Sequence, residues 1–320
     1  IEMSVSELCA LANRRGDLNV RRPRRQWLPE QPTPDTDAPA AGPSPSQTVD
    51  DAALYCEAME KVLAAIKSRN YVKASSCFTL EGLDVYNKLI SYGTGRVVGQ
   101  PDMVYYRSTN GQVVARGLQM SFSFTSGKRK KTFVEDVVFT FNPDKKICNV
   151  AFGLGKVAES DILNRYAPGW KDETRELIME FLENYKTAYC LKRLDYIRDI
   201  FADDAVIIVG NIVKRNLAAV PEERAISLEG QDIIKYNRYD KETYLANLAR
   251  TFKLNEFINL RFTNNDVQWL EKYEDAEIYG IQIGQEYTSS RYADKGYLFL
   301  LVDMTDHDAP QIKVRTWQPN

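Results

Sequence analysis

The sequence predicts an α+β fold made of two compact regions, each with helices packed on one face of a curved antiparallel sheet. In both regions, segments with helical periodicity come first and segments with a period of two follow, which is the order of an α+β unit. Apolar residues in the strands alternate with polar ones, and this pattern disfavours a parallel sheet buried on both faces. The length of 320 residues also exceeds what a single core usually supports.

Composition limits the classes of function. The chain is 44% hydrophobic and 27% charged, as in a globular protein, and its formal net charge of −2 argues against a body that binds nucleic acid or membrane surfaces. No apolar run is long enough to span a bilayer. The five cysteines are scattered and never spaced as C-x-x-C, so neither a zinc site nor a disulfide framework is expected. No metal or cofactor is predicted.

Residues 1–48 are predicted to be a flexible, disordered lead-in and linker. Arginines cluster between Arg14 and Arg25, and residues 29–48 are rich in proline and poor in large apolar residues, so they cannot bury a core. A solvated lead-in is the preferred interpretation. The alternative is a basic arm that contacts nucleic acid or anionic lipid, although the acidic residues that follow weaken it.

The first compact region is predicted to span residues 49–157. Leu54, Ala58, Val62 and Ala65 recur on one face of a helix that ends near residue 67, and two shorter helices follow at about 71–77 and 82–93. The pattern then changes to a period of two, which predicts strands within residues 113–124, 133–141 and 146–155.

One strand of this region carries charged residues on both faces. In FVEDVVFTF, Glu135 falls among the apolar side chains of Phe133, Val137 and Phe139, and Asp136 falls on the opposite face. We expect Asp136 to pair with Arg116, and a pocket acid is the alternative for Asp136.

The second compact region, residues 158–320, repeats the order of the first. Leu177, Phe181, Tyr185 and Ala188 follow the spacing of the first helix at an offset of 123 residues (177 − 54), and the same offset takes Phe78 to Phe201. The shared spacing suggests a duplication.

The remaining elements of the second region follow in order. Asp203 and Asp204 are predicted to form a turn between a short helix and a strand at 205–209, which is followed by a short strand near 232–236. Asp240 is predicted to cap the next helix. The last four strands are expected at about 257–270, 276–288, 296–303 and 311–317, with Leu298, Leu300 and Val302 alternating inward.

This element order is that of the nuclear transport factor two-like cone fold, and IFADDAVIIVG at 200–210 resembles the passage from its second helix to its first strand. That superfamily includes SnoaL-type polyketide cyclases and ketosteroid isomerases. The chain is more closely similar to an uncharacterised two-module family of Bacteroides and relatives, through the segments RGLQMSFSF, FVEDVVFTFN, VAFGLG, FLENYKTAYCLKRLDYI and VRTWQP. The resemblance implies two cone-shaped domains and export to the cell envelope, with the cytoplasm as the other location. It implies no assigned activity.

Enzymes of this superfamily place an acid, a base or a tyrosine in a pocket at the open end of the cone. By that analogy the catalytic candidates are Tyr236, Glu286 and Asp303. The ligand-binding candidates are Arg261, Arg315 and Trp317, because a guanidinium group is the usual partner of a carboxylate. For Arg315 the preferred interpretation is a salt bridge to a carboxylate on a neighbouring strand, such as Glu286, and ligand binding is the alternative.

The only histidine, His307, lies in TDHDAP, a predicted turn between the last two strands. A histidine there cannot anchor a catalytic triad inside a pocket. The neighbouring Asp303, Asp306 and Asp308 lack the glycine and the terminal glutamate of a calcium loop.

Two functional interpretations remain. The preferred one is a non-catalytic binding or scaffolding protein that binds a partner protein or a small ligand, with its two modules paired within the chain or in a homodimer. The alternative is a cofactor-independent enzyme of isomerase, cyclase or dehydratase type that uses acid–base groups in the second region. An enclosed pocket above about 300 Å³ with two converging ionisable groups would favour the enzyme, whereas a pocket filled by aromatic side chains would disfavour it.

Overall fold

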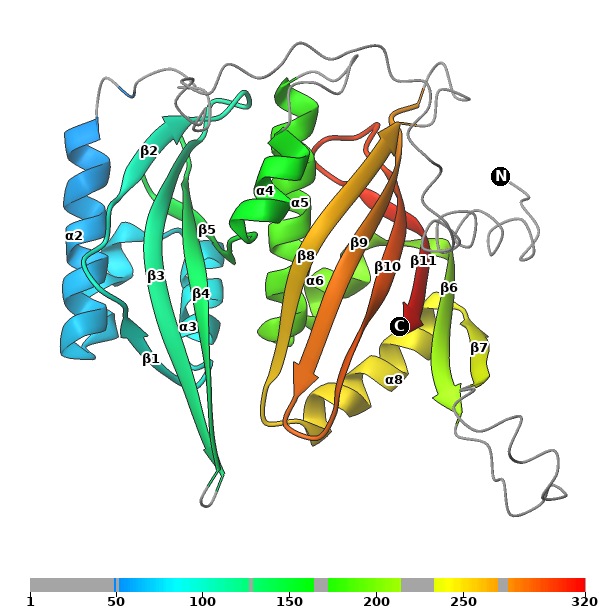
Figure 1. Ribbon diagram of the computed structural model, residues 1–320. Coiled ribbons are helices and arrows are strands. Elements are labelled where there is room, and N and C mark those ends of the chain that lie inside the picture. The colour runs from blue at the N-terminus through cyan, green and yellow to red at the C-terminus, as the bar shows by residue number, and fades with distance from the viewer. Residues whose placement is uncertain are drawn as a thin grey trace, which may run out of the picture. The chain divides into compact units, whose positions relative to one another are not determined.

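The computed structural model describes residue 49 and residues 52–126, 129–163, 172–213, 233–269 and 276–319. The predicted Arg14–Arg25 arm lies outside these residues, as does the rest of the predicted linker. Residues 45–320 form one compact unit. In the described ranges, no helix is both long and apolar enough to cross a bilayer. The predicted α+β class is confirmed, because helices pack against two separate sheets (Figure 1).

Three helical segments come first, at the predicted positions: α2 (Ala52–Ser68), the 3₁₀ helix η2 (Tyr71–Cys77) and α3 (Leu80–Ile90). The buried face of α2 agrees with the prediction at Val62 and Ala65, but in the first half of the helix Tyr55 and Met59 are buried while Leu54 is 48% exposed. The two candidate stripes are one residue apart on the helix. The stripe with Tyr55 and Met59 is buried because it removes more apolar surface from water.

The first sheet has the order β1-β3-β4-β5, with β2 also paired to β3. Its strands are β1 (Thr94–Val97), β2 (Val104–Arg107), β3 (Val113–Ser126), β4 (Arg129–Phe141) and β5 (Ile147–Phe152). The three longer strands agree with the prediction. β1 and β2 were not predicted, because four residues are too few to establish a period of two.

The predicted faces of β3 and β4 are confirmed. Leu118, Met120 and Phe122 from β3 are buried together with Val137 and Phe139 from β4. Glu135 lies among them and is only 8% exposed.

Arg116 does not pair with Asp136 as predicted. Its two terminal nitrogens, Nη1 and Nη2, each donate to the carboxylate of Glu183 at 2.8 Å. The register of β3 against β4 shifts between Ala115 and Leu118, and Gly117 has a φ of 103°. This bulge turns Arg116 away from the buried face that carries Leu118 and onto the face of Asp136, where Glu183 from a later helix is nevertheless its partner.

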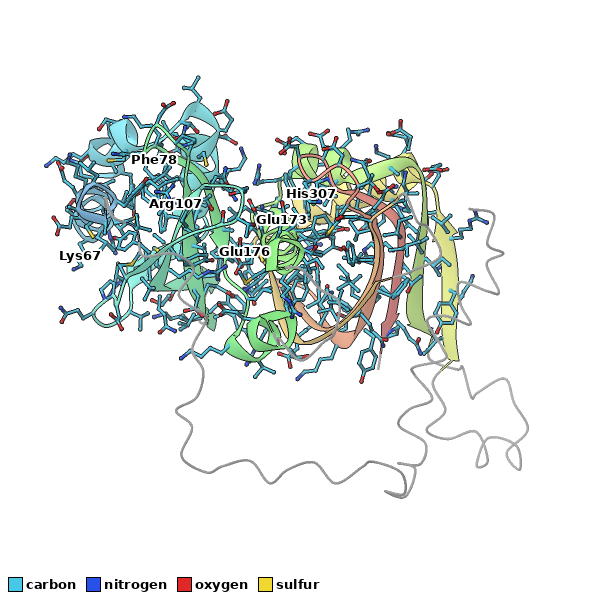
Figure 2. All side chains as sticks on the ribbon, turned by 90° about the horizontal axis from the view of Figure 1, so that it is seen from above. Lys67, Phe78, Arg107, Glu173, Glu176 and His307 are labelled. Carbon is cyan, nitrogen blue, oxygen red and sulfur yellow. The ribbon has the colours of Figure 1, made fainter. Side chains whose placement is uncertain are left out.

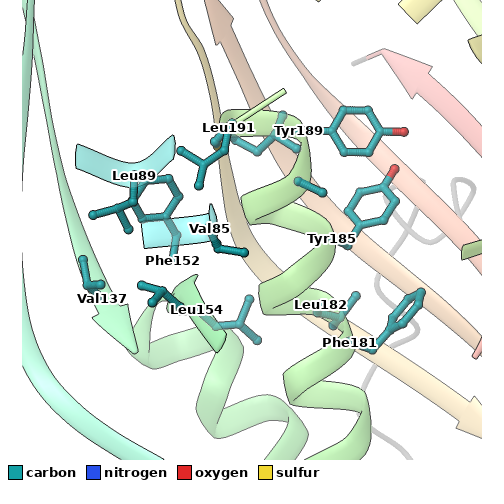
Figure 3. Close-up of a cluster of buried hydrophobic side chains, with 14 of the residues drawn as sticks. Val85, Leu89, Val137, Phe152, Leu154, Phe181, Leu182, Tyr185, Tyr189 and Leu191 are labelled. Atoms are coloured by element: carbon teal, nitrogen blue, oxygen red, sulfur yellow. The ribbon is translucent and has the colours of Figure 1, made fainter. Parts of the chain in front are cut away.

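Three helices join the two sheets: α4 (Lys156–Leu163), α5 (Asp172–Cys190) and α6 (Leu194–Ile200). The sequence predicted α5 and α6 but not α4. Figure 3 shows Phe181, Tyr185 and Tyr189 on one side of α5, and Phe152 and Leu154 from the first half of the chain on its other side. α5 therefore contributes side chains to the cores of both sheets.

The second sheet has the order β7-β6-β11-β10-β9-β8. Its strands are β6 (Phe201–Val213), β7 (Ile233–Tyr239), β8 (Ile258–Trp269), β9 (Ile278–Ser289), β10 (Ala293–Asp303) and β11 (Gln311–Pro319). All neighbours are antiparallel except β6 and β11, which are parallel. Helix α8 (Lys241–Leu254) begins as predicted, because the side chain of Asp240 accepts the N–H of Thr243 at 2.7 Å.

The predicted turn at Asp203 and Asp204 is wrong. β6 begins directly at Phe201, and both aspartates lie inside the strand with exposed side chains. Phe201 pairs with Ile312, but the next regular partners are Val206 and Val314. The residues between Phe201 and Val206 therefore form an irregularity in the strand rather than a turn.

One relationship recurs in both halves of the chain. Phe78, which follows η2, forms a parallel bridge with Ile147, the first residue of β5. Phe201, which follows α6, pairs in parallel with Ile312 near the start of β11. This is the pair of phenylalanines that the sequence offset relates. The division into domains at residues 49–157 and 158–320 stays a prediction.

Candidate functional site

The candidate site lies on the inner face of the second sheet, defined here as the face that carries the buried side chains of Ile281, Ile283 and Leu300. Side chains two residues apart on a strand share a face, so Gln285 and Tyr287 follow Ile283 inward on β9. Arg315 on β11 is the register partner of Leu300, so it points inward too. Two polar groups, Gln285 and Arg315, are thus buried at 5% and 7% exposure.

A cavity of about 130 Å³ separates this face from the helices. Its walls combine tyrosines with aliphatic side chains and two strongly polar groups. They are Tyr185 and Tyr189 from α5, Tyr244, Leu248 and Thr251 from α8, Ile258 and Leu260 from β8, Gln285 and Tyr287 from β9, and Arg315 from β11. Thr251 and Tyr287 are partly exposed and form the rim.

Two tyrosines fix the guanidinium of Arg315. Its Nε donates to the hydroxyl of Tyr185 at 3.1 Å, and its Cζ lies 5.3 Å from the ring centroid of Tyr244, within the range of a cation–π contact. The hydroxyl of Tyr244 is itself 2.6 Å from that of Tyr189. The buried Nη1 of Arg315 has no hydrogen-bond partner. The guanidinium of Arg315 is therefore held by two side chains while its Nη1 nitrogen makes no hydrogen bond.

The tyrosines around Arg315 do not neutralise its positive charge. Burial raises the pKa of Tyr244 to about 12 although Arg315 opposes the shift, and it raises the pKa of Tyr189 well above its ordinary value. Both phenols are therefore uncharged at neutral pH. Among the side chains that the structure describes, no carboxylate forms a salt bridge with Arg315. The carboxyl of Asp294 is near enough to interact with Arg315 electrostatically, and this interaction opposes the rise in its pKa that burial causes.

Gln285 supplies the second unused polar group of the cavity. Its amide oxygen, Oε1, is buried and has no hydrogen-bond partner. Buried polar atoms in folded proteins are nearly always hydrogen-bonded, because leaving one unpaired costs about 1–3 kcal/mol. Arg315 on β11 and Gln285 on β9 thus both line the cavity, and each has one buried atom without a hydrogen-bond partner.

The structure separates the residues that the sequence nominated. Glu286 is on the outer face of β9 and pairs with Lys295 rather than with Arg315, so the salt bridge that we expected for Arg315 is not formed. Arg261 on β8 is exposed and is the register partner of Glu286. Neither lines the cavity around Arg315.

The other three nominated residues also lie apart from one another. Tyr236 on β7 is 43% exposed, and Asp303 at the end of β10 accepts the N–H of Thr305 at 3.1 Å. Trp317 is buried on the inner face as the register partner of Leu298, but it is not in the wall of the cavity. The nominated set therefore does not form one site, and only Arg315 lies at the cavity.

His307 occupies the predicted turn between β10 and β11. Its Nε2 is 3.0 Å from a carboxylate oxygen of Glu277, and its Nδ1 is 3.8 Å from one of Glu173 at the start of α5. Figure 2 shows His307 and Glu173 close together. Among the described residues, no group of three or more histidine, cysteine, aspartate or glutamate side chains is placed to hold a metal ion.

None of the tyrosines of the site was predicted to be a site residue. Tyr185 and Tyr244 were expected on the inward faces of their helices, where both are buried, and Tyr189 received no role. One signal was present, because Tyr185 and Tyr189 are four residues apart and so share a face of α5. A polar hydroxyl at two such positions indicates a buried site that needs hydrogen-bond donors.

Comparison with known proteins adds little to this geometry. No protein-family model matches the chain, and no curated protein matches it. Structural matches do exist at low similarity. A protein from Novosphingobium aromaticivorans, provisionally described as a scytalone dehydratase, is 9% identical and has a TM-score of 0.32, covering 46% of this chain and 84% of its own.

Two further structures match in the same way. A protein from the same organism, provisionally described as the beta subunit of an aromatic-ring-hydroxylating dioxygenase, is 17% identical with a TM-score of 0.30, covering 45% of this chain and 88% of its own. The helical cell shape determining protein Pgp2 of Campylobacter jejuni is 9% identical with a TM-score of 0.33, covering 72% of this chain and 97% of its own. At such scores these similarities assign neither an activity nor a ligand.

Proposed function

We propose that this protein is a non-catalytic binding protein that holds a small carboxylate against Arg315. The observation that carries the proposal is the side chain of Arg315, which lines the cavity and has a buried Nη1 without a hydrogen-bond partner. An unpaired buried charge is costly, and an anion that enters the cavity would restore both the hydrogen bond and the charge balance. Tyr185 and Tyr244 hold the guanidinium in place before the ligand arrives, which reduces the entropic cost of binding.

The composition of the cavity supports binding rather than catalysis. Its described walls contain no aspartate, glutamate, histidine, lysine or cysteine, so they offer no general base that is ionised near neutral pH. Tyr244 and Tyr287, whose pKa values are raised to about 12 by burial, are protonated there. The volume of about 130 Å³ is also below the range of about 300–1,000 Å³ of typical enzyme and drug pockets. The isomerase, cyclase or dehydratase alternative therefore lacks its acid–base pair in this cavity.

The proposal includes pairing of the two modules within the chain. Lys186 of α5 donates to Glu135 of β4 at 2.7 Å, and Asn259 of β8 donates to the same carboxylate at 2.6 Å. These contacts connect the two sheets through buried polar groups. They support a single body in which the first module holds α5, and α5 in turn holds two of the cavity's tyrosines.

The test is calorimetric titration of the full chain with propionate and with propionamide, a neutral molecule of similar size and shape. We expect propionate to bind and propionamide to bind at least tenfold more weakly, because only the acid supplies a negative charge to Arg315. Equal binding of the two ligands, or no binding of either, would refute the proposal without any mutation.

A pair of variants locates the site. Arg315→Met should weaken propionate binding about tenfold or more, since a hydrogen bond to a charged group contributes roughly 1.5–3 kcal/mol. Arg261→Met is the matched control, because Arg261 was also nominated from the sequence but lies exposed on β8, outside the cavity. Circular dichroism of both variants checks that the fold is retained. Loss of binding in the Arg261 variant alone would place the anion site on the outer face of the sheet.

A further inference from the structure

We infer that the cavity takes short-chain aliphatic carboxylates, and that Tyr287 at its rim sets the limit of chain length. This inference rests on the proposed function, because it names the class of ligand for the same cavity. Every side chain of the described wall is buried except those of Thr251 and Tyr287, which are partly exposed. The rim of the cavity therefore lies between helix α8, which carries Thr251, and strand β9, which carries Tyr287.

The strand registers place Arg315 and Tyr287 at different levels of the sheet. Arg315 is paired with Leu300 on β10, and Leu300 is paired with Ile281 on β9. Tyr287 is six residues further along β9 (287 − 281), which corresponds to about 20 Å of strand. Both side chains line the same cavity, so they face it from opposite ends. A carboxylate held by Arg315 therefore directs its hydrocarbon chain toward Tyr287.

The wall between these two ends suits a hydrocarbon chain of limited length. Leu248, Ile258 and Leu260 are buried and apolar. The volume of about 130 Å³ is slightly smaller than the cavity of about 150 Å³ that holds one benzene molecule in an engineered protein core. The cavity therefore holds about six non-hydrogen atoms, which is the size of butyrate.

A longer chain meets the ring of Tyr287. This ring packs against that of Tyr292 in the β9–β10 hairpin, with the two centroids 6.2 Å apart. Hexanoate would have to displace the ring or distort the wall, and overfilling a packed site weakens it.

This limit reverses the usual effect of chain length on affinity. Burying one further methylene group usually tightens binding about fourfold. On an open apolar surface, hexanoate should therefore bind more tightly than butyrate. In a cavity closed by Tyr287, hexanoate should bind more weakly. The order of the two affinities distinguishes the two situations.

The experiment is calorimetric titration of the full chain with propionate, butyrate and hexanoate in turn. We expect butyrate to bind at least as tightly as propionate, and hexanoate to bind about tenfold or more weaker than butyrate. Hexanoate that binds as tightly as butyrate, or more tightly, would overturn this inference and leave the proposed function standing. Absence of binding by all three carboxylates would instead overturn the proposed function.

A variant assigns the limit to Tyr287. Tyr287→Val removes the phenol ring and keeps a β-branched residue that suits a strand. The affinity for hexanoate relative to butyrate should rise about tenfold or more in this variant. Tyr287→Phe keeps the ring and should retain the exclusion of hexanoate. If Tyr287→Val does not fold, Tyr287→Leu removes the ring with a smaller loss of apolar volume and serves the same comparison.

The matched control is Tyr236→Val. Tyr236 lies on β7, the edge strand of the same sheet, is 43% exposed and is not in the wall of the cavity. The ratio of the two affinities should not change in this variant. An unchanged ratio in the Tyr287 variant, or an equal rise in the Tyr236 variant, would overturn the role of Tyr287.

Discussion

The hydroxyl of Thr187 accepts the main-chain N–H of Phe152 at 2.7 Å and donates to the carbonyl of Glu183 at the same distance. Phe152 ends β5, which is the edge strand of the first sheet. The next two residues also form hydrogen bonds with side chains of α5. The carbonyl of Gly153 accepts from Nζ of Lys186 at 2.8 Å, and the N–H of Leu154 donates to the carboxylate of Glu183 at 3.0 Å. One face of α5 thus supplies the hydrogen bonds that a further strand would otherwise make.

Removing the hydroxyl of Thr187 should leave the N–H of Phe152 buried and unpaired. We expect Thr187→Val, which keeps the shape of the side chain, to lower the free energy of unfolding in urea by about 1–3 kcal/mol. Native-state hydrogen exchange should show a loss of protection at the Phe152 amide. Thr187→Ser keeps the hydroxyl and is the control. Equal protection of this amide in both variants would show that the hydrogen bond contributes nothing.

The ion pair between Lys186 and Glu135 should be costly to break from one side. Their side chains are only 5% and 9% exposed, so Lys186→Met leaves a carboxylate buried without its cation, and we expect a loss of about 3–5 kcal/mol in the free energy of unfolding. Adding Glu135→Gln should restore most of that loss, because the amide keeps an oxygen for Asn259.

The control for this pair lies on the surface of α2. Lys61 and Glu57 also form an ion pair, but their side chains are 54% and 60% exposed. Lys61→Met should therefore have little effect on the free energy of unfolding, because solvent screens an exposed ion pair. If Lys61→Met and Lys186→Met had equal effects, burial would not be the cause.

The faces of the strands could be predicted because a period of two leaves only two choices, and the apolar residues decide between them. Glu135 was placed correctly on the buried face of β4 by this rule alone. Applied to β9, the same rule places Ile281 and Ile283 inward and Glu286 outward, so the exclusion of Glu286 from the cavity was within reach of the sequence. The partner of Arg116 could not be predicted by this rule, because Glu183 lies on α5, 67 residues further along the chain.

The rest of the site depends on how helices lie across the sheet. Arg315 was nominated from its strand. Its contacts with Tyr185 and Tyr244 depend on the positions of α5 and α8. These two tyrosines precede Arg315 by 130 and 71 residues in the sequence (315 − 185 and 315 − 244). Helical periodicity gives the buried stripe of each helix but not its place over the sheet. The unpaired Nη1 of Arg315 is a property of that packing, and no local pattern encodes it.

Glu180 on α5 should make stability depend on pH. Burial raises the pKa of its carboxyl above the ordinary value of 4.5, and the nearby Glu183 adds to the shift. A raised pKa means that the native state binds the proton more tightly, so this contribution to stability is fully present below the ordinary pKa and is lost as pH rises through the native pKa. Glu180→Gln should therefore raise the melting temperature at neutral pH and have little effect in acid.

Glu57 provides a control of opposite sign. The hydrogen bond and the charge of Lys61 lower the pKa of this exposed carboxyl, so its contribution is present above the ordinary pKa and is lost as pH falls through the native pKa. Glu57→Gln should not raise the melting temperature at neutral pH. A melting temperature of Glu180→Gln that follows the unmodified protein at every pH would contradict the proposed burial effect.

Phe201 marks the point where α6 passes into β6, and its side chain is 1% exposed. Its ring centroid lies 5.6 Å from that of Tyr244, so it supports one of the tyrosines that hold Arg315. We expect Phe201→Ala to lower the free energy of unfolding by about 3–5 kcal/mol, because the cavity that it leaves is enclosed by the core. Leu54→Ala is the comparison, since Leu54 was predicted to be buried but is 48% exposed, and it should change stability by no more than about 0.5 kcal/mol. Urea denaturation of both variants measures the difference. A free energy of unfolding for Phe201→Ala within about 0.5 kcal/mol of that of the unmodified protein would show that the packing of α6 against β6 is not as described.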